Sequence, residues 1–175
     1  MRASGNAAGK VTYAPMLLLL IRHAQAAEQD EARYPDDTLR PLVPKGRKAQ
    51  RRITRELRRH KVVPRRVFSS PWKRAWQTAR IVVDELELAK SARIACPALA
   101  AAPDLDDLAA QVGDIAPEET LALVGHEPWM SELASLLLTG KRAGLNIDFA
   151  KSGIMGIETD RIAEGGGTLR FYIRP

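Results

Sequence analysis

An arginine and a histidine, Arg22 and His23, directly follow the apolar run Leu17–Ile21. A short apolar run of this kind predicts a buried strand, and α/β proteins gather their chemistry where such strands end. A second apolar run, Leu121–Val124, is followed one residue later by His126. Two of the chain's three histidines therefore have equivalent positions, each just beyond a predicted strand.

A third polar group comes from the segment between these strands. Ser70 and Pro71 predict the start of a helix, with Ser70 as its N-cap and Pro71 as its first residue. Arg74 then lies in the opening turns of this helix, where it can face the same strand ends as both histidines.

These side chains predict phosphoryl chemistry if they converge. The guanidinium groups of Arg22 and Arg74 are planar and always charged, and they match the oxygens of a phosphoryl group. Their charges disfavour protonation of His23 and so keep its imidazole nucleophilic. We expect His23 to attack phosphorus in line and water to release the transferred group, while His126 stabilises the phosphoryl charge.

A metal site is the competing use of the histidines. No third histidine or cysteine clusters with them at a metal-type spacing, so we expect neither a metal ion nor another cofactor. His60 is expected on the surface, and Lys151 and Ser152 in a surface loop. Trp72 and Trp76, four residues apart, are expected to pack or to wall a pocket rather than to stack on nucleic-acid bases.

Composition indicates one soluble domain. The chain has 175 residues, of which 45% are hydrophobic and 27% charged, and it contains no run of apolar residues long enough to span a membrane. The single cysteine, Cys96, excludes an internal disulfide and favours a reducing cytoplasm. Residues 1–15 are expected to form a disordered extension, with the domain at 16–175. A signal peptide is the alternative, but Met16–Ile21 is shorter than the usual apolar region of about 7–15 residues.

Short apolar runs alternate with helical patterns along the chain. This alternation predicts a single-domain three-layer α/β/α sandwich whose sheet is mostly parallel, with an antiparallel edge. The expected strands are 17–21, 66–68, 93–95, 120–124, 153–158 and 168–173, and the expected helices are 45–60, 71–88, 105–112 and 128–138.

The positive charge is concentrated in one segment. The chain has a net charge of +6, but residues 45–66 hold eleven Lys and Arg against one acid, Glu56. Ala49, Ile53 and Leu57 recur at four-residue intervals there, which predicts a helix with a narrow buried stripe and a basic outer face. A solvated surface is the simplest interpretation, and a docking surface for an acidic protein or nucleic acid is the alternative.

Taken in order, the motifs of this chain resemble those of the histidine phosphatase (phosphoglycerate mutase-like) superfamily, in particular its compact SixA-type phosphohistidine phosphatase branch. The resemblance extends from Met16 to about Ile173. It rests on four segments: Arg22-His23-Ala24, with alanine where the family usually has glycine; Arg40-Pro41-Leu42 followed by Gly46; Ser69-Ser70-Pro71 through Arg74-Ala75 and Gln77-Thr78; and Val124-Gly125-His126-Glu127-Pro128.

The resemblance implies a role for each site residue. His23 is the residue that becomes phosphorylated, Arg22 and Arg74 bind the phosphoryl oxygens, and His126 completes the phosphate site. It also implies a cytoplasmic signal-transduction enzyme that needs no cofactor. The implied partner is a phosphocarrier protein or a histidine phosphotransfer domain, or else a small phosphorylated molecule; neither a membrane nor a nucleic acid is the favoured partner.

A departure from the family pattern bears on the substrate. Many larger members have an acid that protonates the leaving oxygen in the region where this chain has Ala98. An alkoxide, with a conjugate-acid pKa of roughly 15–16, needs such an acid, whereas an imidazole, at about 6.5, needs it much less. Ala98 therefore favours a P–N bond in the substrate, although Asp104 or Asp106 could replace the missing acid.

We thus expect a metal-independent phosphatase that acts through a phosphohistidine intermediate on protein phosphohistidine. One alternative is a broader small-molecule phosphomonoesterase or pyrophosphate hydrolase. Another is a non-catalytic binding module that uses the basic patch at residues 45–66.

Overall fold

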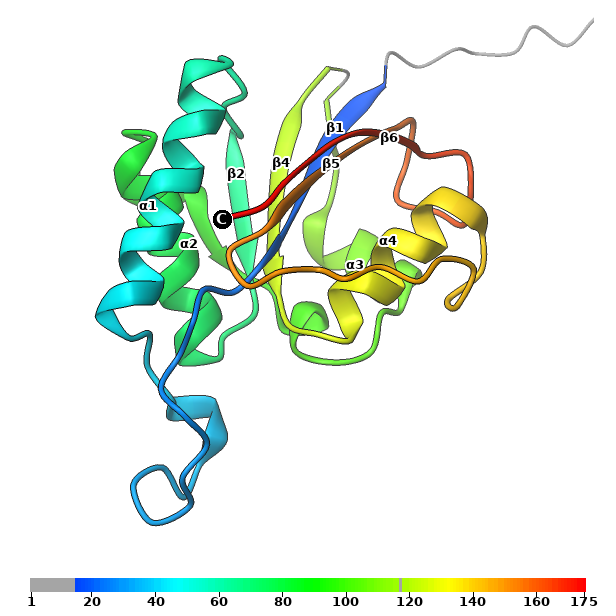
Figure 1. Ribbon diagram of the computed structural model, residues 1–175. Coiled ribbons are helices and arrows are strands. Elements are labelled where there is room, and N and C mark those ends of the chain that lie inside the picture. Colours follow the sequence, from blue (N-terminus) through cyan, green and yellow to red (C-terminus); the bar gives the residue numbers. More distant parts are fainter. Residues whose placement is uncertain (1–14, 117) are drawn as a thin grey trace, which may run out of the picture.

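The computed structural model describes residues 15–116 and 118–175, which form one six-stranded sheet between two pairs of helices (Figure 1). The strands are β1 (Met16–Arg22), β2 (Arg66–Ser69), β3 (Arg93–Ala95), β4 (Thr120–Gly125), β5 (Ile154–Thr159) and β6 (Thr168–Ile173). The helices are α1 (Pro44–Arg59), α2 (Lys73–Glu85), α3 (Leu105–Val112) and α4 (Trp129–Thr139). The extension expected at residues 1–15 lies, apart from its last residue, outside the described residues.

The sheet is mixed and has the order β3-β2-β4-β1-β5-β6. The four strands β1, β2, β3 and β4 are parallel to one another. Strand β5 is antiparallel to β1, and β6 is antiparallel to β5. Helices α1 and α2 cover one face of the sheet and α3 and α4 cover the other (Figure 1). The predicted three-layer architecture with an antiparallel edge is therefore confirmed.

Two hydrophobic cores lie on opposite faces of the sheet. In β1, Leu18 and Leu20 pack in the core with α3 and α4, whereas Leu19 and Ile21 pack in the core with α1 and α2. Successive side chains of a strand point to opposite faces, so a strand covered on both faces needs an unbroken apolar run. This burial explains why β1 reads as consecutive leucines.

The register of the parallel strands aligns their carboxyl ends. Arg22 at the end of β1 pairs with Gly125 of β4, and Ser69 at the end of β2 pairs with Val124. The residues that follow leave the sheet from the carboxyl ends of three neighbouring strands. We call this end of the sheet, where the parallel strands finish, the carboxyl edge. The segment between β1 and α1 projects beyond this edge (Figure 1).

Helices α1 and α2 both run back from the carboxyl edge, side by side. A hydrogen bond from Arg47 to Gln77 (3.1 Å) links their early turns, and an ion pair between Arg55 and Glu85 (2.8 Å) links their later turns. Within the described part of the chain, no helix is long and apolar enough to cross a bilayer.

Candidate active site

The two strand-end histidines meet at the carboxyl edge. His23 follows β1 and His126 follows β4, and the distance between their ring centroids is 5.1 Å. The backbone N–H of His23 donates to the carbonyl of Gly125 at 3.0 Å, which fixes the two chain segments together. Both side chains are buried. The strand register thus brings together two residues that are about a hundred positions apart in the sequence.

A backbone hydrogen bond settles which nitrogen of His23 carries the proton. Nδ1 of His23 lies 2.8 Å from the carbonyl oxygen of Ala24. Because a carbonyl oxygen can only accept, Nδ1 must be the donor, and Nε2 of the neutral ring keeps its lone pair. The side chain is therefore held in the tautomer that a nucleophilic Nε2 requires.

Ser70 belongs to this site, and its predicted role as N-cap is wrong. Helix α2 begins at Lys73, two residues later than predicted, and its N-cap is Trp72. The Ser70 hydroxyl accepts a hydrogen bond from the backbone N–H of Trp72 at 3.3 Å and lies closer, at 2.8 Å, to Nε2 of His126. Ser70 follows β2, next to β4, so its hydroxyl reaches the imidazole more directly than it reaches the first turn of α2.

Arg74 enters the site from the first turn of α2. Its Nη1 donates to the backbone carbonyl of Asp37 at 2.8 Å and pairs with the Asp37 carboxylate at 3.0 Å. The guanidinium carbon lies 4.6 Å from the ring centroid of Trp72. Arg22 is held from the other side of the site, where its Nη1 donates to the carbonyl of Phe149.

Three buried nitrogens of the site have no hydrogen-bond partner among the described residues. Among the described residues, four buried side-chain nitrogen or oxygen atoms have no hydrogen-bond partner, and three of them are Arg22 Nε, Arg74 Nε and His126 Nδ1. The arginine nitrogens can only donate. Buried donors without partners are costly, so this arrangement is suited to binding an anion rich in acceptor oxygens.

Both histidines are held neutral. Burial, together with the charges of Arg74 and Arg22, lowers the pKa of His23 to about 3, against the opposing effect of its bond to Ala24. Burial and the neighbouring His23 and Arg74 lower the pKa of His126 to about 3 as well. At neutral pH neither ring carries a charge, so the positive field of the site comes from the arginines.

Two tryptophans stand beside His126. The ring centroid of Trp72 is 4.6 Å from that of His126, and that of Trp129 is 6.2 Å away. Trp129 also lines a small cavity with Ala98, the residue that stands where larger family members are expected to have an acid. This side of the site is therefore aromatic and apolar.

Neither of the alternative acids lies at the site. Asp104 is the N-cap of α3, and its carboxylate accepts hydrogen bonds from the backbone of Asp106 and Asp107. Asp104 and Asp106 line a hollow together with Arg142, beyond the far end of α4. Asp37 does face Arg74. Burial raises the pKa of its carboxyl group, but the hydrogen bonds and charges of Arg40 and Arg74 lower this pKa by more, so Asp37 is not a proton donor at neutral pH.

The residue after His23, Ala24, is held in place by packing and by one hydrogen bond. Ala24 is fully buried with Ala26, Leu42 and Ile81, and its N–H donates to the Thr78 hydroxyl at 3.0 Å. Its φ is not positive, so the glycine usual in the family is not required here.

Ser152 was expected in a surface loop but is buried beside the site. Its N–H donates to the carbonyls of Arg22 (3.2 Å) and His23 (3.3 Å). Lys151 is exposed as expected. No periodic pattern of the sequence marks Ser152, because its burial depends on a loop that returns to the end of β1.

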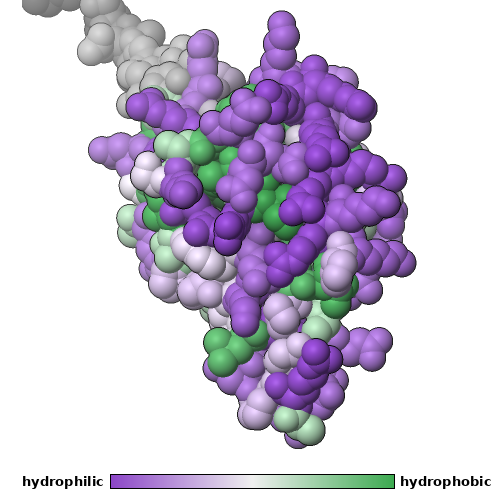
Figure 2. All heavy atoms as spheres, turned by 90° about the vertical axis from the view of Figure 1, so that its left-hand side faces the viewer, coloured by the Kyte–Doolittle hydropathy of each residue, from purple (hydrophilic) through white to green (hydrophobic). Residues whose placement is uncertain are grey.

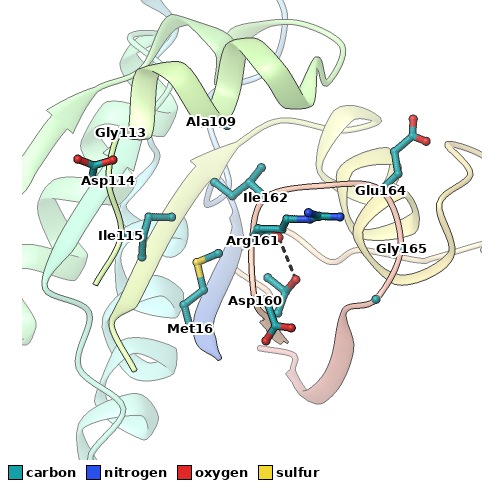
Figure 3. A pocket seen from close by; sticks show the side chains of 12 residues that line it. Met16, Ala109, Gly113, Asp114, Ile115, Asp160, Arg161, Ile162, Glu164 and Gly165 are labelled. Atoms are coloured by element: carbon teal, nitrogen blue, oxygen red, sulfur yellow. Dashed lines mark hydrogen bonds between the residues drawn. The ribbon is translucent and has the colours of Figure 1, made fainter. Parts of the chain in front are cut away.

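A larger hollow lies at the other end of the sheet, where β1 begins. Figure 3 shows it between Met16, at the start of β1, and Ile162, beyond β5. Met16 is seven residues from His23, about 23 Å along a strand. Among the described residues, no histidine, cysteine or serine lines this hollow, in contrast to the site at the carboxyl edge. Among the described residues, no group of three or more His, Cys, Asp or Glu side chains could hold a metal ion.

Fold and site together define a class of α/β enzyme built to handle phosphoryl groups. A model of the histidine phosphatase superfamily (branch 1) matches residues 18–95. The chain is 30% identical over 162 residues to the phosphohistidine phosphatase SixA of Escherichia coli K12, covering 91% of this chain and 94% of that protein. It is also 32% identical over 146 residues to an uncharacterized protein of Picosynechococcus, covering 82% and 86% of the two chains. The chain belongs to the histidine phosphatase superfamily and is a phosphatase.

Solved structures agree with this assignment. The structure of the protein histidine phosphatase SixA complexed with tungstate matches with a TM-score of 0.73 and 26% identity, covering 91% of this chain and 97% of that one. A SixA structure from Agrobacterium tumefaciens matches with a TM-score of 0.70 over 92% of this chain and 99% of that one. At 19% identity, the second match supports the fold alone.

Proposed function

We propose that this protein is a metal-independent phosphatase that removes phosphoryl groups from protein phosphohistidine through a phosphorylated His23. The observation that carries the proposal is the surrounding of His23. Its Nε2 lone pair lies in a site where Arg22, Arg74 and His126 have buried nitrogens with no partner among the described residues. A phosphoryl group offers the acceptor oxygens that the arginine donors need.

The reaction has two displacement steps. In the first, Nε2 of His23 attacks phosphorus, a new P–N bond forms, and the bond between phosphorus and the substrate's imidazole breaks. The electron pair of that bond leaves with the imidazole, which departs as a neutral ring because its other nitrogen carries a proton. The bond from Nδ1 to the Ala24 carbonyl stabilises the positive charge that His23 acquires. In the second step, water attacks phosphorus, and inorganic phosphate leaves while His23 regains its lone pair.

The leaving-group side of the site supports a P–N substrate. Ala98 offers no proton, and Trp72 and Trp129 present aromatic surface next to His126. An imidazole is planar and, with a conjugate-acid pKa of about 6.5, leaves without the help that an alkoxide requires. The relationship to SixA, named a phosphohistidine phosphatase, supports the same substrate class. A reducing cytoplasm, where signalling phosphocarriers act, is the compartment that we propose, in keeping with the buried and unpaired Cys96.

The test measures inorganic phosphate released, with a metal chelator present, from three substrates: phosphohistidine, phospholysine and an alkyl phosphate. We expect turnover of phosphohistidine to exceed that of the alkyl phosphate by at least about 100-fold, since only the alkyl phosphate needs a general acid. His23→Ala should lower the rate by at least about 10³-fold. His60→Ala, at an exposed histidine outside the site, should keep the wild-type rate.

Other outcomes would redirect the proposal. Comparable turnover of phosphohistidine and the alkyl phosphate would establish a broader phosphatase, with a general acid elsewhere in the chain. Loss of turnover on adding the chelator would contradict metal independence. No turnover of any substrate would leave a binding module as the better interpretation.

A further inference from the structure

The basic face predicted for residues 45–66 is divided by the structure into two halves. Helix α1 carries eight Lys and Arg. In its later turns these cations are neutralised within the molecule: Arg55 pairs with Glu85, Arg58 with Glu87 and Arg59 with Glu56, each at 2.8 Å. The acids come mainly from α2 and the residues after it, so a count along the α1 sequence could not reveal them.

The early turns of α1 keep their charge. Lys45, Lys48 and Arg52 are exposed and form no ion pair with any described residue. Their spacing places them on one stripe of the helix, opposite its buried residues, and we call these three the α1 ridge. Figure 2 shows the face that includes α1, where hydrophilic side chains predominate.

The fold does not explain the α1 ridge. The first turn of a helix favours acidic side chains and disfavours cations, because its backbone N–H groups create a partial positive charge. The first turn of α1 contains no acid. Lys45, the second residue of α1, is therefore electrostatically unfavourable where it stands, and an anion outside the molecule would relieve this.

The α1 ridge begins next to the candidate active site. The side-chain oxygen of Gln77 accepts hydrogen bonds from the backbone of Leu42 at 2.9 Å and from Arg47 at 3.1 Å. Gln77 lies one turn beyond Arg74 on α2. The first turn of α1 is thus level with Arg74, at the same edge as His23.

Other exposed charges at the carboxyl edge make one side of this surface positive and the projecting segment negative. Lys73, at the start of α2, is exposed and adds to the positive side. The projecting segment before α1 has Glu28, Asp30 and Glu31 exposed. An acidic partner approaching His23 would be repelled by this segment and attracted toward α1.

We propose that the α1 ridge is the docking surface for an acidic protein face that carries the phosphohistidine and is oriented by the ridge over His23. This inference rests on the proposed function, since it assumes a protein-bound substrate. From Lys45 to Arg52 the ridge spans about 10 Å along the helix axis, which suits a few carboxylates on a partner domain. Nucleic acid is the weaker candidate, because the later half of the face is neutralised within the molecule.

The test compares one triple variant with a matched control. Lys45→Gln, Lys48→Gln and Arg52→Gln together remove the ridge. Lys90→Gln, Lys141→Gln and Arg161→Gln remove the same charge from exposed positions away from the carboxyl edge. The substrates are two synthetic peptides with one central phosphohistidine, flanked by four glutamates or by four glutamines, and free phosphohistidine.

We expect the wild type and the control to favour the glutamate peptide by about 10-fold in kcat/KM at low ionic strength, with the preference shrinking as salt is added. The ridge variant should lose this preference and still hydrolyse free phosphohistidine at the wild-type rate, which also shows that it is folded. A preference retained in the ridge variant would overturn the inference. So would ridge-dependent binding of an oligonucleotide without any preference between the peptides.

A binding measurement separates this inference from the proposed function. The unphosphorylated glutamate peptide is titrated against the His23→Ala variant, with and without the ridge substitutions, and tryptophan fluorescence is followed. Ridge-dependent, salt-sensitive binding without turnover of phosphohistidine by the wild type would support the docking surface while contradicting the proposed reaction. Normal turnover of phosphohistidine, with peptide binding that does not depend on the ridge, would support the proposed reaction while contradicting the docking surface.

Discussion

The Ser70 hydroxyl is the contact that sets the orientation of His126. It lies 2.8 Å from Nε2, and the other ring nitrogen, Nδ1, is buried without a partner. If the hydroxyl donates to Nε2, the neutral ring must carry its proton on Nδ1. His126 then has one donor free for an acceptor such as a phosphoryl oxygen, and in the proposed reaction Ser70 would be a positioning residue that acts through this ring.

We therefore expect Ser70→Ala to lower kcat for phosphohistidine by about 10-fold, less than the 10²–10³-fold typical when a stabilising donor is itself removed, as in His126→Ala. The matched control is Ser69→Ala, because the Ser69 hydroxyl is also buried but bonds to the Ser70 carbonyl. Steady-state kinetics of the three variants provide the measurement. Equal losses in Ser69→Ala and Ser70→Ala would show that Ser70 has only a structural role.

At the scale of elements, Gly46 permits the close approach of α1 to the loop after His23. A Cβ at this position would lie 2.2 Å from the backbone oxygen of Gln25. Gly46→Ala should therefore push α1 away from the loop, at a cost of about 1–3 kcal/mol that exceeds the gain in helix propensity of about 1 kcal/mol.

Urea unfolding measures this change. Because the added Cβ would meet backbone atoms of Gln25, the cost falls in the upper half of its range, and we expect Gly46→Ala to lower the free energy of unfolding by about 1–2 kcal/mol. Lys48→Ala, at an exposed position of the same helix, should stay within about 0.5 kcal/mol of the wild type. A Gly46→Ala variant as stable as the wild type would mean that α1 and the loop can separate without loss of packing.

The elements themselves were largely predictable, and the contacts between them were not. The β1 and β4 strands followed from apolar runs, and equivalent strand ends predicted that His23 and His126 would lie together. The sequence predicts the wrong main contact for Ser70, because its local helix-start signal competes with a partner, His126, that follows β4. Likewise the ion pairs of Arg55 and Arg58 depend on acids about thirty residues away, on another element.

The two buried histidines make the free energy of unfolding of the whole molecule depend on pH. His23 and His126 are buried as neutral rings, and burial with nearby positive charge lowers the pKa of each to about 3. In the unfolded chain a histidine has a pKa of about 6.5. Between these values the unfolded state binds protons that the folded state excludes, so stability is complete above about pH 6.5 and falls as the pH decreases toward 3.

Each histidine should lower the free energy of unfolding by about 2 kcal/mol between pH 6.5 and 4.5, from 1.36 kcal/mol per proton and pH unit. Asp37 and Glu119, whose pKa values are lowered, act mainly below about pH 4.5, the lower limit of this window. Urea unfolding at pH 6.5, 5.5 and 4.5 should show His23→Gln and His126→Gln each removing about half of the dependence. His60→Gln, which keeps both buried rings, should preserve it. Parallel curves for all four proteins would mean that the buried rings are protonated in the folded state, and His23 would then lack the lone pair that the proposed reaction requires.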